Sequence, residues 1–529
     1  MHPVFQAAME REFGAIADLV RLHAQHTPER PALADAQHTL DYRALDALMD
    51  RIAASLQRDG LQPGDAIAVC AASSVNYAAV FLGALRAGVA VAPLAPGSTP
   101  ASLARMMSDA DARLLFSDAS AAEVIGPAVP GGIGRIALDG SQVGAAFEAW
   151  LAPAGARPAP VEAQPAWPFN IIYSSGTTGE PKGIVQGHGM RWAHVQRGAK
   201  YEYDSSTVTL LSTPLYSNTT LVVFFPTIAF GGCVVLMPKF DALGYLQLAV
   251  KHGVTHTMLV PVQYQRLMAH PRFGEHDLSS YRFKFSTSAP FNAALKADVL
   301  RRWPGGLIEF YGMTEGGGTC ILEAHLHPTK LHTVGQAAPG SDIRLIDEAG
   351  NELPRDQLDA NGEVAGHPAG EVVGHSAGMM TGYHRQPEKT REAEWFDATG
   401  KRFIRTGDVG RFDADGFLTL FDRKKDMIIS GGFNIYPSDL EAVLRGHAAV
   451  ADVAVVGVPS EQWGETPVAF VVRKDGDATT EQALLQWTND QLGKTQRLAR
   501  LRFIDELPRS AIGKVLKREL RELRERDPG

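Results

Sequence analysis

Short apolar runs alternate with amphipathic helical segments along the first part of the chain, and this alternation limits the folds open to it. The run at 66–70 is strand-like, residues 75–88 have helical periodicity, and the run at 89–93 is again strand-like. Residues 101–110 then follow a helical pattern before a third strand-like run at 113–118. Strands that alternate with amphipathic helices form helix-covered parallel sheets, so we predict a doubly wound α/β sheet.

A proline-rich segment separates this region from a second one in which further strands are predicted. Residues 152–168 hold five prolines and no apolar period, so we interpret them as a loop or linker. Further strands are predicted at 169–173, 209–212, 257–260 and 283–287. These strands predict a second α/β subdomain.

The texture changes from about residue 339 to short strands and turns rich in Gly and Asp, with a hairpin turn at 413–416. Strands at 452–459 and 469–476, between helical segments, indicate a small α+β domain. We therefore predict an α/β protein in two parts. Residues 1–424 form a large N-terminal domain of doubly wound α/β subdomains plus a small β-rich subdomain, and a hinge joins it to a small mobile C-terminal domain, residues 425–529.

Composition excludes some classes of protein. The formal net charge is −8 over 529 residues, which argues against a nucleic-acid protein whose affinity rests on a large basic surface. Cys70, Cys233 and Cys320 are far apart in the sequence, so they form neither a disulfide framework nor a zinc site. Such cysteine usage favours a reducing cytoplasm.

One apolar stretch, 221–238, has 18 residues without a charge, the lower limit for a membrane span. Pro226 and the pair Gly231-Gly232 interrupt it, so we predict a buried helix, a turn and a strand instead. The first residues lack the apolar region of a signal peptide, and no membrane span is expected.

A loop of small and hydroxylated residues, SSGTTGEPKG, occupies 174–183 and follows a predicted strand. Small residues let the backbone wrap an anion, hydroxyls add hydrogen-bond donors, and Lys182 can neutralise phosphate charge. It is not a Walker loop, because Pro181 precedes the lysine and no GK[ST] sequence occurs there. By composition alone, a flexible surface loop and a phosphate-binding loop remain equal alternatives.

This loop resembles the signature loop of the adenylate-forming superfamily, which comprises acyl- and aryl-CoA synthetases, peptide-synthetase adenylation domains and firefly-type luciferases. The resemblance covers most of the chain, from about residue 40 to residue 521, and the other motifs follow in the family's order. It implies ATP binding by this loop. The residues concerned are Thr178 and Lys182, as catalytic residues, with Ser174, Ser175, Gly176, Thr177 and Gly179 as nucleotide contacts.

Two further motifs resemble the adenine and phosphate side of the family's site. Residues 309–315, EFYGMTE, match its YGxTE motif, and Ser288-Ala289-Pro290 matches its adenine-side turn. The resemblance implies that an aromatic ring stacks on adenine, a threonine meets the phosphate, and Glu315 acts in catalysis by holding Mg²⁺ with Thr178. A carboxylate suits Mg²⁺, which prefers one or two carboxylates plus phosphate oxygens. The implied nucleotide contacts here are Ser288, Ala289, Pro290, Glu309, Tyr311, Gly312 and Thr314.

Three motifs in the last quarter of the chain complete the pattern: TGD at 406–408, DRKKDMI at 422–428 and PRSAIGKV at 508–515. The resemblance implies ribose contacts by Asp408 and Arg423, and a hinge at Lys425, where many CoA ligases have aspartate. It also implies that Lys514 is the catalytic lysine of adenylation, whose charge stabilises a pentavalent phosphorus transition state. Each motif by itself also has an ordinary structural interpretation. TGD is a common turn, KKD is a common exposed run of charges, and a single lysine near the end of a chain is usually solvated.

Relatives that use CoA suggest two more groups of residues. The implied CoA contacts are Gly431, Gly432 and Trp463, and the implied acyl-pocket residues are Tyr216, Ser217, Asn218, Gly316 and Gly317. CoA ligases often carry histidine where this chain has Ser217, and the family's Tyr-Lys-x-Pro is missing after residue 492. The gate beside the acyl site is therefore expected to differ in shape.

The implied activity is that of an ATP-dependent carboxylate–CoA ligase, an AMP-forming acid–thiol ligase with ATP, Mg²⁺ and coenzyme A as cofactors. Three glycines at 316–318 leave room for an aromatic, phenylpropenoate or medium-chain acid, or they relieve backbone crowding. A stand-alone adenylation enzyme that loads a carrier protein and a non-catalytic adenylate-binding protein are the alternatives. We expect a small carboxylic acid as substrate, CoA as acceptor, a cytoplasmic location and no nucleic-acid partner, with a homodimer as the candidate assembly.

Overall fold

The structure is a computed structural model that describes residues 3–174, 181–354, 369–423, 426–430, 433–460, 463–493, 496–510 and 513–526. The chain divides into two compact units. Unit 1 comprises Met1–His332, Ala337–Asp342 and Gly374–Ile404, and unit 2 comprises Thr333–Gln336, Ile343–Val373 and Arg405–Gly529. The chain passes between the units within β16 (Gln336–Ala337), β17 (Ser341–Ile346), β18 (Gly370–Ser376) and β21 (Arg402–Phe412).

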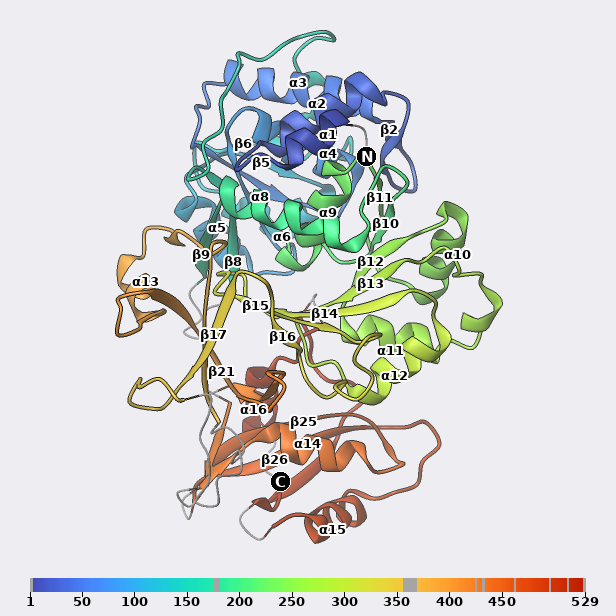
Figure 1. Cartoon of the computed structure of the whole chain (residues 1–529), viewed down its shortest axis with the longest axis vertical. Coiled ribbons are helices and arrows are strands. Elements are labelled where there is room, and N and C mark those ends of the chain that lie inside the picture. Colours follow the sequence, from blue (N-terminus) through green and yellow to red (C-terminus); the bar gives the residue numbers. More distant parts are fainter. Residues whose placement is uncertain are drawn as a thin grey trace. The chain divides into compact units, whose positions relative to one another are not determined.

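Unit 1 contains two mostly parallel sheets (Figure 1). The first has the order β15-β14-β13-β12-β10-β11-β1-β2, parallel except at β14–β15 and β1–β2. Its strands are β1 (Pro31–Ala34), β2 (Thr39–Asp41), β10 (Val208–Leu211), β11 (Cys233–Leu236), β12 (His256–Leu259), β13 (Phe283–Ser286), β14 (Gly306–Gly312) and β15 (Thr319–Glu323).

The second sheet has the order β19-β9-β8-β4-β3-β5-β6-β7, parallel from β8 onward. Its strands are β3 (Ala66–Cys70), β4 (Ala90–Pro93), β5 (Ala112–Ser117), β6 (Gly134–Ala137), β7 (Ala145–Ala146), β8 (Pro168–Ser174), β9 (Lys182–Gly187) and β19 (Gly382–Tyr383). Every residue of β3 and β4 is buried, as expected of parallel strands covered on both faces.

Helices cover these sheets. They are α1 (Pro3–Met9), α2 (Ile16–His26), α3 (Tyr42–Arg58), α4 (Val75–Arg86), α5 (Pro100–Asp109), α6 (Ala119–Ile125), α7 (Phe147–Trp150), α8 (His188–Arg197), α9 (Asn218–Ala229), α10 (Ala242–His252), α11 (Pro261–Ala269), α12 (Ala293–Arg302) and α13 (Pro387–Glu392). Short polar side chains begin several of them: Ser74 accepts a hydrogen bond from the Tyr77 amide at α4. The alternating pattern therefore folds as the predicted doubly wound α/β sheet.

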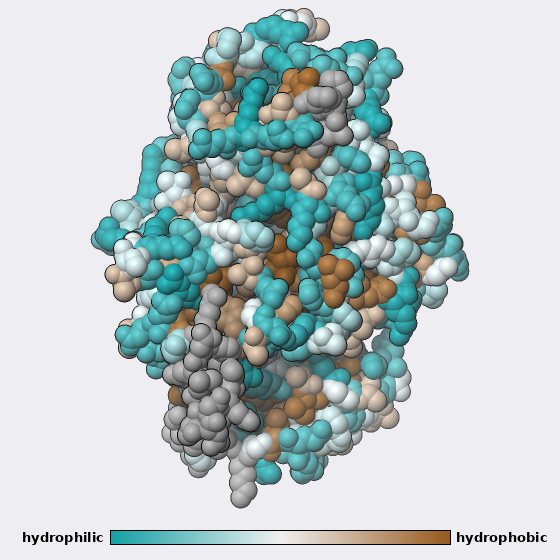
Figure 2. Space-filling view, viewed as in Figure 1, coloured by the Kyte–Doolittle hydropathy of each residue, from teal (hydrophilic) through white to brown (hydrophobic). Residues whose placement is uncertain are grey.

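The apolar stretch 221–238 forms helix α9, a turn and strand β11, as predicted. Gly231 makes the turn with a φ of +83°, and a Cβ there would lie 2.6 Å from the His23 ring. Within the described part of the chain, no helix is long and apolar enough to cross a bilayer. The face drawn in Figure 2 is mostly hydrophilic, and its apolar residues form small groups.

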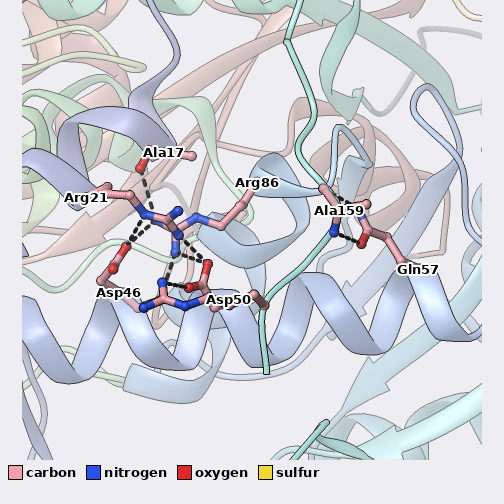
Figure 3. Close-up of polar contacts among 8 residues, drawn as sticks. Ala17, Arg21, Asp46, Asp50, Gln57, Arg86 and Ala159 are labelled. Atoms are coloured by element: carbon pink, nitrogen blue, oxygen red, sulfur yellow. Dashed lines mark hydrogen bonds and ion pairs between the residues drawn. The ribbon is translucent and has the colours of Figure 1, made fainter. Parts of the chain in front are cut away.

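An ion cluster around the buried carboxylate of Asp50 ties the proline-rich connection to the N-terminal helices (Figure 3). Asp50 of α3, 2% exposed, accepts hydrogen bonds from Arg86 of α4 at 2.9 Å and from Arg157 of the connection at 2.5 Å. The Gln57 side chain forms two hydrogen bonds with the backbone of Ala159, at 2.9 and 2.8 Å. The segment predicted as a loop or linker therefore lies within unit 1 and is held against α3.

Unit 2 contains a sheet of order β24-β23-β26-β25, with β27 parallel to β26. Its elements are β23 (Ile428–Ser430), β24 (Phe433–Ile435), β25 (Val450–Ser460), β26 (Gly464–Arg473), β27 (Arg500–Phe503), α14 (Pro437–Arg445), α15 (Glu481–Gln491) and α16 (Lys517–Arg526). The predicted turn at 413–416 joins β21 to β22 (Leu418–Arg423) in an antiparallel hairpin. Strand β20 (Glu394–Phe396) pairs with the first residues of β21 in unit 1. The small α+β domain expected at the C-terminus is thus present.

Candidate functional site

Three of the predicted motifs follow neighbouring parallel strands of unit 1. Residues 213–218 follow β10, residues 287–290 follow β13, and residues 311–315 end and follow β14. Strands β10, β12, β13 and β14 are parallel and adjacent in the sheet. Their carboxyl ends lie at one edge, where open α/β sheets bind ligands. The structure therefore brings the predicted acyl gate, adenine turn and YGxTE motif together.

A hydrogen bond joins the residue after the predicted acyl gate to the predicted adenine turn. Thr219, at the start of α9, and Ser288 place their hydroxyl oxygens 2.5 Å apart. Ser288 has a φ of +79°, a conformation rare for residues other than glycine, and the backbone after β13 turns sharply there. Ser217 is buried and caps α9, since its hydroxyl accepts from the Thr219 amide at 3.3 Å. Tyr216 and Asn218 on either side of Ser217 are half-buried.

Lys182 and Glu315 are brought together through a residue that the sequence did not indicate. Tyr383 of β19 donates its hydroxyl to Glu315 Oε1 at 2.9 Å, and Lys182 Nζ lies 4.9 Å from the centre of its ring. The Tyr383 side chain is buried, and burial together with the negative charge of Glu315 raises its pKa. Tyr383 therefore stays protonated and can only donate to this carboxylate.

Behind the YGxTE motif lies a buried polar network that the sequence did not indicate either. Gln186 of β9 donates to the Thr314 carbonyl at 2.7 Å and to Asn218 Oδ1 at 3.5 Å. Arg191 of α8 contacts the Gln186 side chain and donates twice to Asn170 Oδ1, at 3.1 and 3.0 Å. Among the described residues Arg191 has no carboxylate partner, and burial lowers its pKa to about 9. The sequence signal for this network is Gln186, a polar residue that follows the apolar residues of β9.

Glu309 faces the interior of unit 1. It is 4% exposed and forms an ion pair with Lys296 of α12. Lys296 also donates to the Leu331 carbonyl at 2.8 Å. Burial raises the pKa of Glu309, and the ammonium of Lys296 opposes that effect. The ion pair with Lys296 explains how the Glu309 carboxylate is stabilised inside the protein. The contact of Glu309 with the nucleotide stays a prediction.

The glycines after the YGxTE motif lie where the backbone is crowded. Gly316 has a φ of +72°, and a Cβ there would lie 2.0 Å from the Gly378 carbonyl oxygen. A Cβ on Gly317 would lie 2.7 Å from Cβ of Ile404. Backbone crowding therefore explains why both positions are glycine. That Gly316 and Gly317 line an acyl pocket stays a prediction.

In unit 2, the two residues expected at the ribose lie opposite each other. Asp408 and Arg423 are register partners on the antiparallel strands β21 and β22. The Thr406 hydroxyl accepts from the Asp408 amide at 3.0 Å and donates to the Val372 carbonyl at 2.8 Å. The TGD turn is thereby fixed by its own side chain.

Lys514 lies next to an antiparallel bridge between Arg509 and Val515 in unit 2. The Ser510 amide donates to the Lys514 carbonyl at 2.8 Å, and the Lys514 amide donates to the Ser510 hydroxyl at 3.2 Å. The Arg509 side chain donates to the Gly513 carbonyl at 2.6 Å and to Asp452 at 2.5 Å. Lys514 itself is exposed, as a lysine that reaches a substrate must be. Main-chain hydrogen bonds therefore hold the Lys514 backbone against Ser510, while its side chain is exposed.

For the remaining predicted site residues, the structure gives only the strand position or the exposure, and some of them lie outside the described ranges. Ser174 is the register partner of Lys182 in the β8–β9 pair, which sets the first residue of the loop opposite its lysine. Ala289 is half-buried, Pro290 is exposed, and Tyr311 and Gly312 end β14. Trp463 is 51% exposed beside β26. The predictions for Ser175, Gly176, Thr177, Thr178, Gly179, Lys425, Gly431 and Gly432 lie outside the described residues.

The residues present fit a Mg²⁺ ion bound together with phosphates. Among the described residues, no group of three or more His, Cys, Asp or Glu side chains is placed to form an all-protein metal site. Glu315 is half-buried and uses Oε1 to accept from Tyr383, which leaves carboxylate lone pairs for a cation. A single oriented carboxylate that shares its tyrosine partner with Lys182 matches the way Mg²⁺ is held in nucleotide sites.

Comparison with known proteins agrees with this geometry. A family model described as AMP-binding enzyme matches residues 20–384, and one described as AMP-binding enzyme C-terminal domain matches residues 439–514. The fatty acid–[acyl-carrier-protein] ligase ScoC of Streptomyces coeruleorubidus is 32% identical over 94% of this chain and 94% of its own. The 4-coumarate–CoA ligase 5 of Oryza sativa subsp. japonica is 32% identical over 91% of this chain and 89% of its own.

A solved structure has a similar fold over most of the chain. ATP-bound MatB from Rhodopseudomonas palustris matches with a TM-score of 0.83 and 29% identity, covering 96% of this chain and 99% of that one. The predicted superfamily and the predicted α/β fold with a small C-terminal domain are confirmed. The predicted enzyme class, an AMP-forming ligase, is confirmed as well. The chain belongs to the AMP-binding enzyme family of adenylate-forming ligases.

Proposed function

We propose that this protein is an ATP-dependent carboxylate–CoA ligase that forms an acyl-adenylate and then an acyl-CoA thioester. The observation that carries the proposal is the meeting of Lys182 and Glu315 at Tyr383, at the edge where the motifs after β10, β13 and β14 converge. A lysine and a carboxylate that contact the same tyrosine can serve a phosphate chain and its cation. The similarity to a 4-coumarate–CoA ligase supports CoA as the acceptor.

In the first half-reaction, a carboxylate oxygen of the acid attacks the α-phosphorus of ATP, and the bond to pyrophosphate breaks. The acid needs no side-chain base, because it is ionised at neutral pH. Lys182 binds phosphate oxygens, and Lys514 offsets the charge that develops on the α-phosphate. When bound, Mg²⁺ neutralises phosphate charge and is held by Glu315, with Thr178 as a further ligand.

In the second half-reaction, the CoA sulfur attacks the acyl carbon, and AMP leaves as the thioester forms. We place the domain boundary at residues 424 and 425 and propose that the C-terminal domain, residues 425–529, rotates about Lys425 between the two steps. This rotation withdraws Lys514 and presents Gly431, Gly432 and Trp463 to CoA, a hinge motion that serves two reactions. The exposed indole of Trp463 supports this role.

We propose an aromatic, phenylpropenoate or medium-chain acid as the substrate. The support is the similarity to a ligase named for 4-coumarate, a phenylpropenoate, and to a ligase named for fatty acids. The acid would lie near the gate formed by Tyr216, Ser217 and Asn218. We further propose a cytoplasmic location, consistent with three free cysteines, and a homodimer as the assembly to test first.

The alternative acceptor is a separate carrier protein. The ligase ScoC, to which this chain is 32% identical, is named for transfer to acyl-carrier protein. Adenylation is the same for both acceptors, so the two functions differ only in the second half-reaction.

Mass spectrometry of the products separates these functions. The protein is incubated with MgATP, CoA and a pool of carboxylic acids, and a new acyl-CoA mass names both acceptor and acid. Acyl-adenylate or AMP without thioester would favour a carrier protein. Lys514→Ala should abolish adenylation with little change in stability, because Lys514 is exposed. A pool of acids that yields neither product would refute the proposed ligase.

A further inference from the structure

Tyr383 joins three segments that are far apart in the sequence. Its strand β19 pairs antiparallel with β9, so that Tyr383 lies opposite Ile184, two residues after Lys182. The His384 amide donates to the Gly183 carbonyl at 2.7 Å. The position of Tyr383 along β9 is therefore set by main-chain hydrogen bonds.

The same segment also fixes Glu315. The Met380 amide donates to the Glu315 carbonyl at 2.7 Å, while the Tyr383 hydroxyl donates to its carboxylate at 2.9 Å. Both the main chain and the side chain of Glu315 are thus held by residues 380–383. A hydrogen bond to a charged acceptor is stronger than one between neutral groups, so this contact restrains the carboxylate well.

The Tyr383 ring carries the second contact. Lys182 Nζ lies 4.9 Å from the ring centre, within the range of a cation–π interaction. Among the described residues, Lys182 and Glu315 form no ion pair with each other, although both contact this one side chain. A direct pair would neutralise both charges, whereas contacts to a tyrosine leave each charge available to a ligand.

We propose that Tyr383 is a positioning residue for adenylation, which holds Lys182 and Glu315 separate and oriented toward the magnesium-bound triphosphate. This inference rests on the proposed function and extends it to a residue outside the recognised motifs. The hydroxyl acts on Glu315 and therefore on Mg²⁺, while the ring acts on Lys182 and therefore on phosphate. The two effects are separable by substitution.

Tyr383→Phe keeps the ring and removes the hydroxyl. We expect the Mg²⁺ concentration that half-saturates nucleotide binding to rise roughly tenfold, the scale for losing one hydrogen bond to a charged group. Binding of ATP at saturating Mg²⁺ should change little. Tyr383→Leu also removes the ring, so nucleotide affinity should fall at every Mg²⁺ concentration, because Lys182 is then free to pair with Glu315.

Calorimetric titration with a non-hydrolysable ATP analogue, at a series of Mg²⁺ concentrations, measures these effects without turnover or knowledge of the acid. Tyr245→Phe is the matched control, because it removes a buried tyrosine hydroxyl bonded to Thr257 at 2.8 Å, away from the motifs. The control should lower the melting temperature without changing the Mg²⁺ dependence.

An unchanged Mg²⁺ dependence in Tyr383→Phe, with wild-type nucleotide binding intact, would overturn the positioning role and leave the proposed function standing. Equal shifts in Tyr383→Phe and Tyr245→Phe would also overturn it, because the effect would then be one of stability. Failure of the wild type to bind the magnesium–nucleotide complex would overturn the proposed function, and this inference with it.

Discussion

Lys296→Met should destabilise unit 1 strongly, because it leaves the Glu309 carboxylate buried without its partner. The two side chains are 2% and 6% exposed, and burial already raises the pKa of Glu309 against the attraction of Lys296. Removing one member of a buried ion pair costs about 3–5 kcal/mol. Methionine keeps most of the apolar stem of lysine, so most of this loss would come from the charge and not from a cavity.

Hydrogen exchange of the β14 amides, followed by mass spectrometry, measures this effect where it arises. At about 1.4 kcal/mol per tenfold, a loss of 3–5 kcal/mol accelerates globally limited exchange by roughly 10²–10⁴. The pKa of the orphaned carboxyl should be raised further in the folded state, so the folded protein binds a proton that the unfolded chain has lost. Stability of the variant should therefore fall as pH rises above the unfolded value near 4.5.

Two variants test the reasoning. Lys251→Met, at an exposed lysine of α10, should leave the exchange of β14 unchanged. Lys296→Met combined with Glu309→Leu should recover most of the stability, because a matched apolar pair leaves no buried charge. A loss below about 1 kcal/mol in Lys296→Met, or no recovery in the double variant, would refute a buried ion pair at this position.

Three further predictions follow from the described contacts. Gly316→Ala should destabilise by more than the roughly 1–3 kcal/mol of a positive φ alone, since its Cβ would lie 2.0 Å from the Gly378 carbonyl; a thermal-melt loss equal to that of Gly253→Ala, whose φ is +57° in open space, would contradict this. Burial lowers the pKa values of His23, His188 and His256 to about 4, so the free energy of unfolding should be constant above pH 6.5 and fall below it, by up to about 1.4 kcal/mol per pH unit for each histidine. Urea midpoints that stay flat from pH 7.5 to 5 would disprove neutral buried histidines. Arg191→Met should cost less than Lys296→Met in the same exchange assay, because no opposite charge is left buried; an equal or larger cost would reveal an unrecognised partner.

The local sequence predicted the elements and the order of the motifs. The runs that became β3, α4 and β4 had the periodicity of their final structures, because burial against a sheet requires particular spacings of apolar residues. The turn before β11 was equally visible, because Gly231 adopts a positive φ that other residues rarely take. Pro226, which was also expected to interrupt the stretch, lies inside α9, and the helix continues through it to Ala229. Such features depend on neighbouring residues, and a single sequence contains them.

Only the tertiary structure decided which side chains meet. Tyr383 is 68 residues from Glu315, and their contact exists because β19 pairs with β9 beside the end of β14. The burial of Glu309 against Lys296 likewise follows from the packing of α12 on the sheet. Pairing order between distant strands is fixed by the summed packing of the whole unit and not by residues near either partner. The sequence by itself therefore determined the family, the elements and the residues that carry charge, and the fold determined which of those charges are paired and which face a ligand.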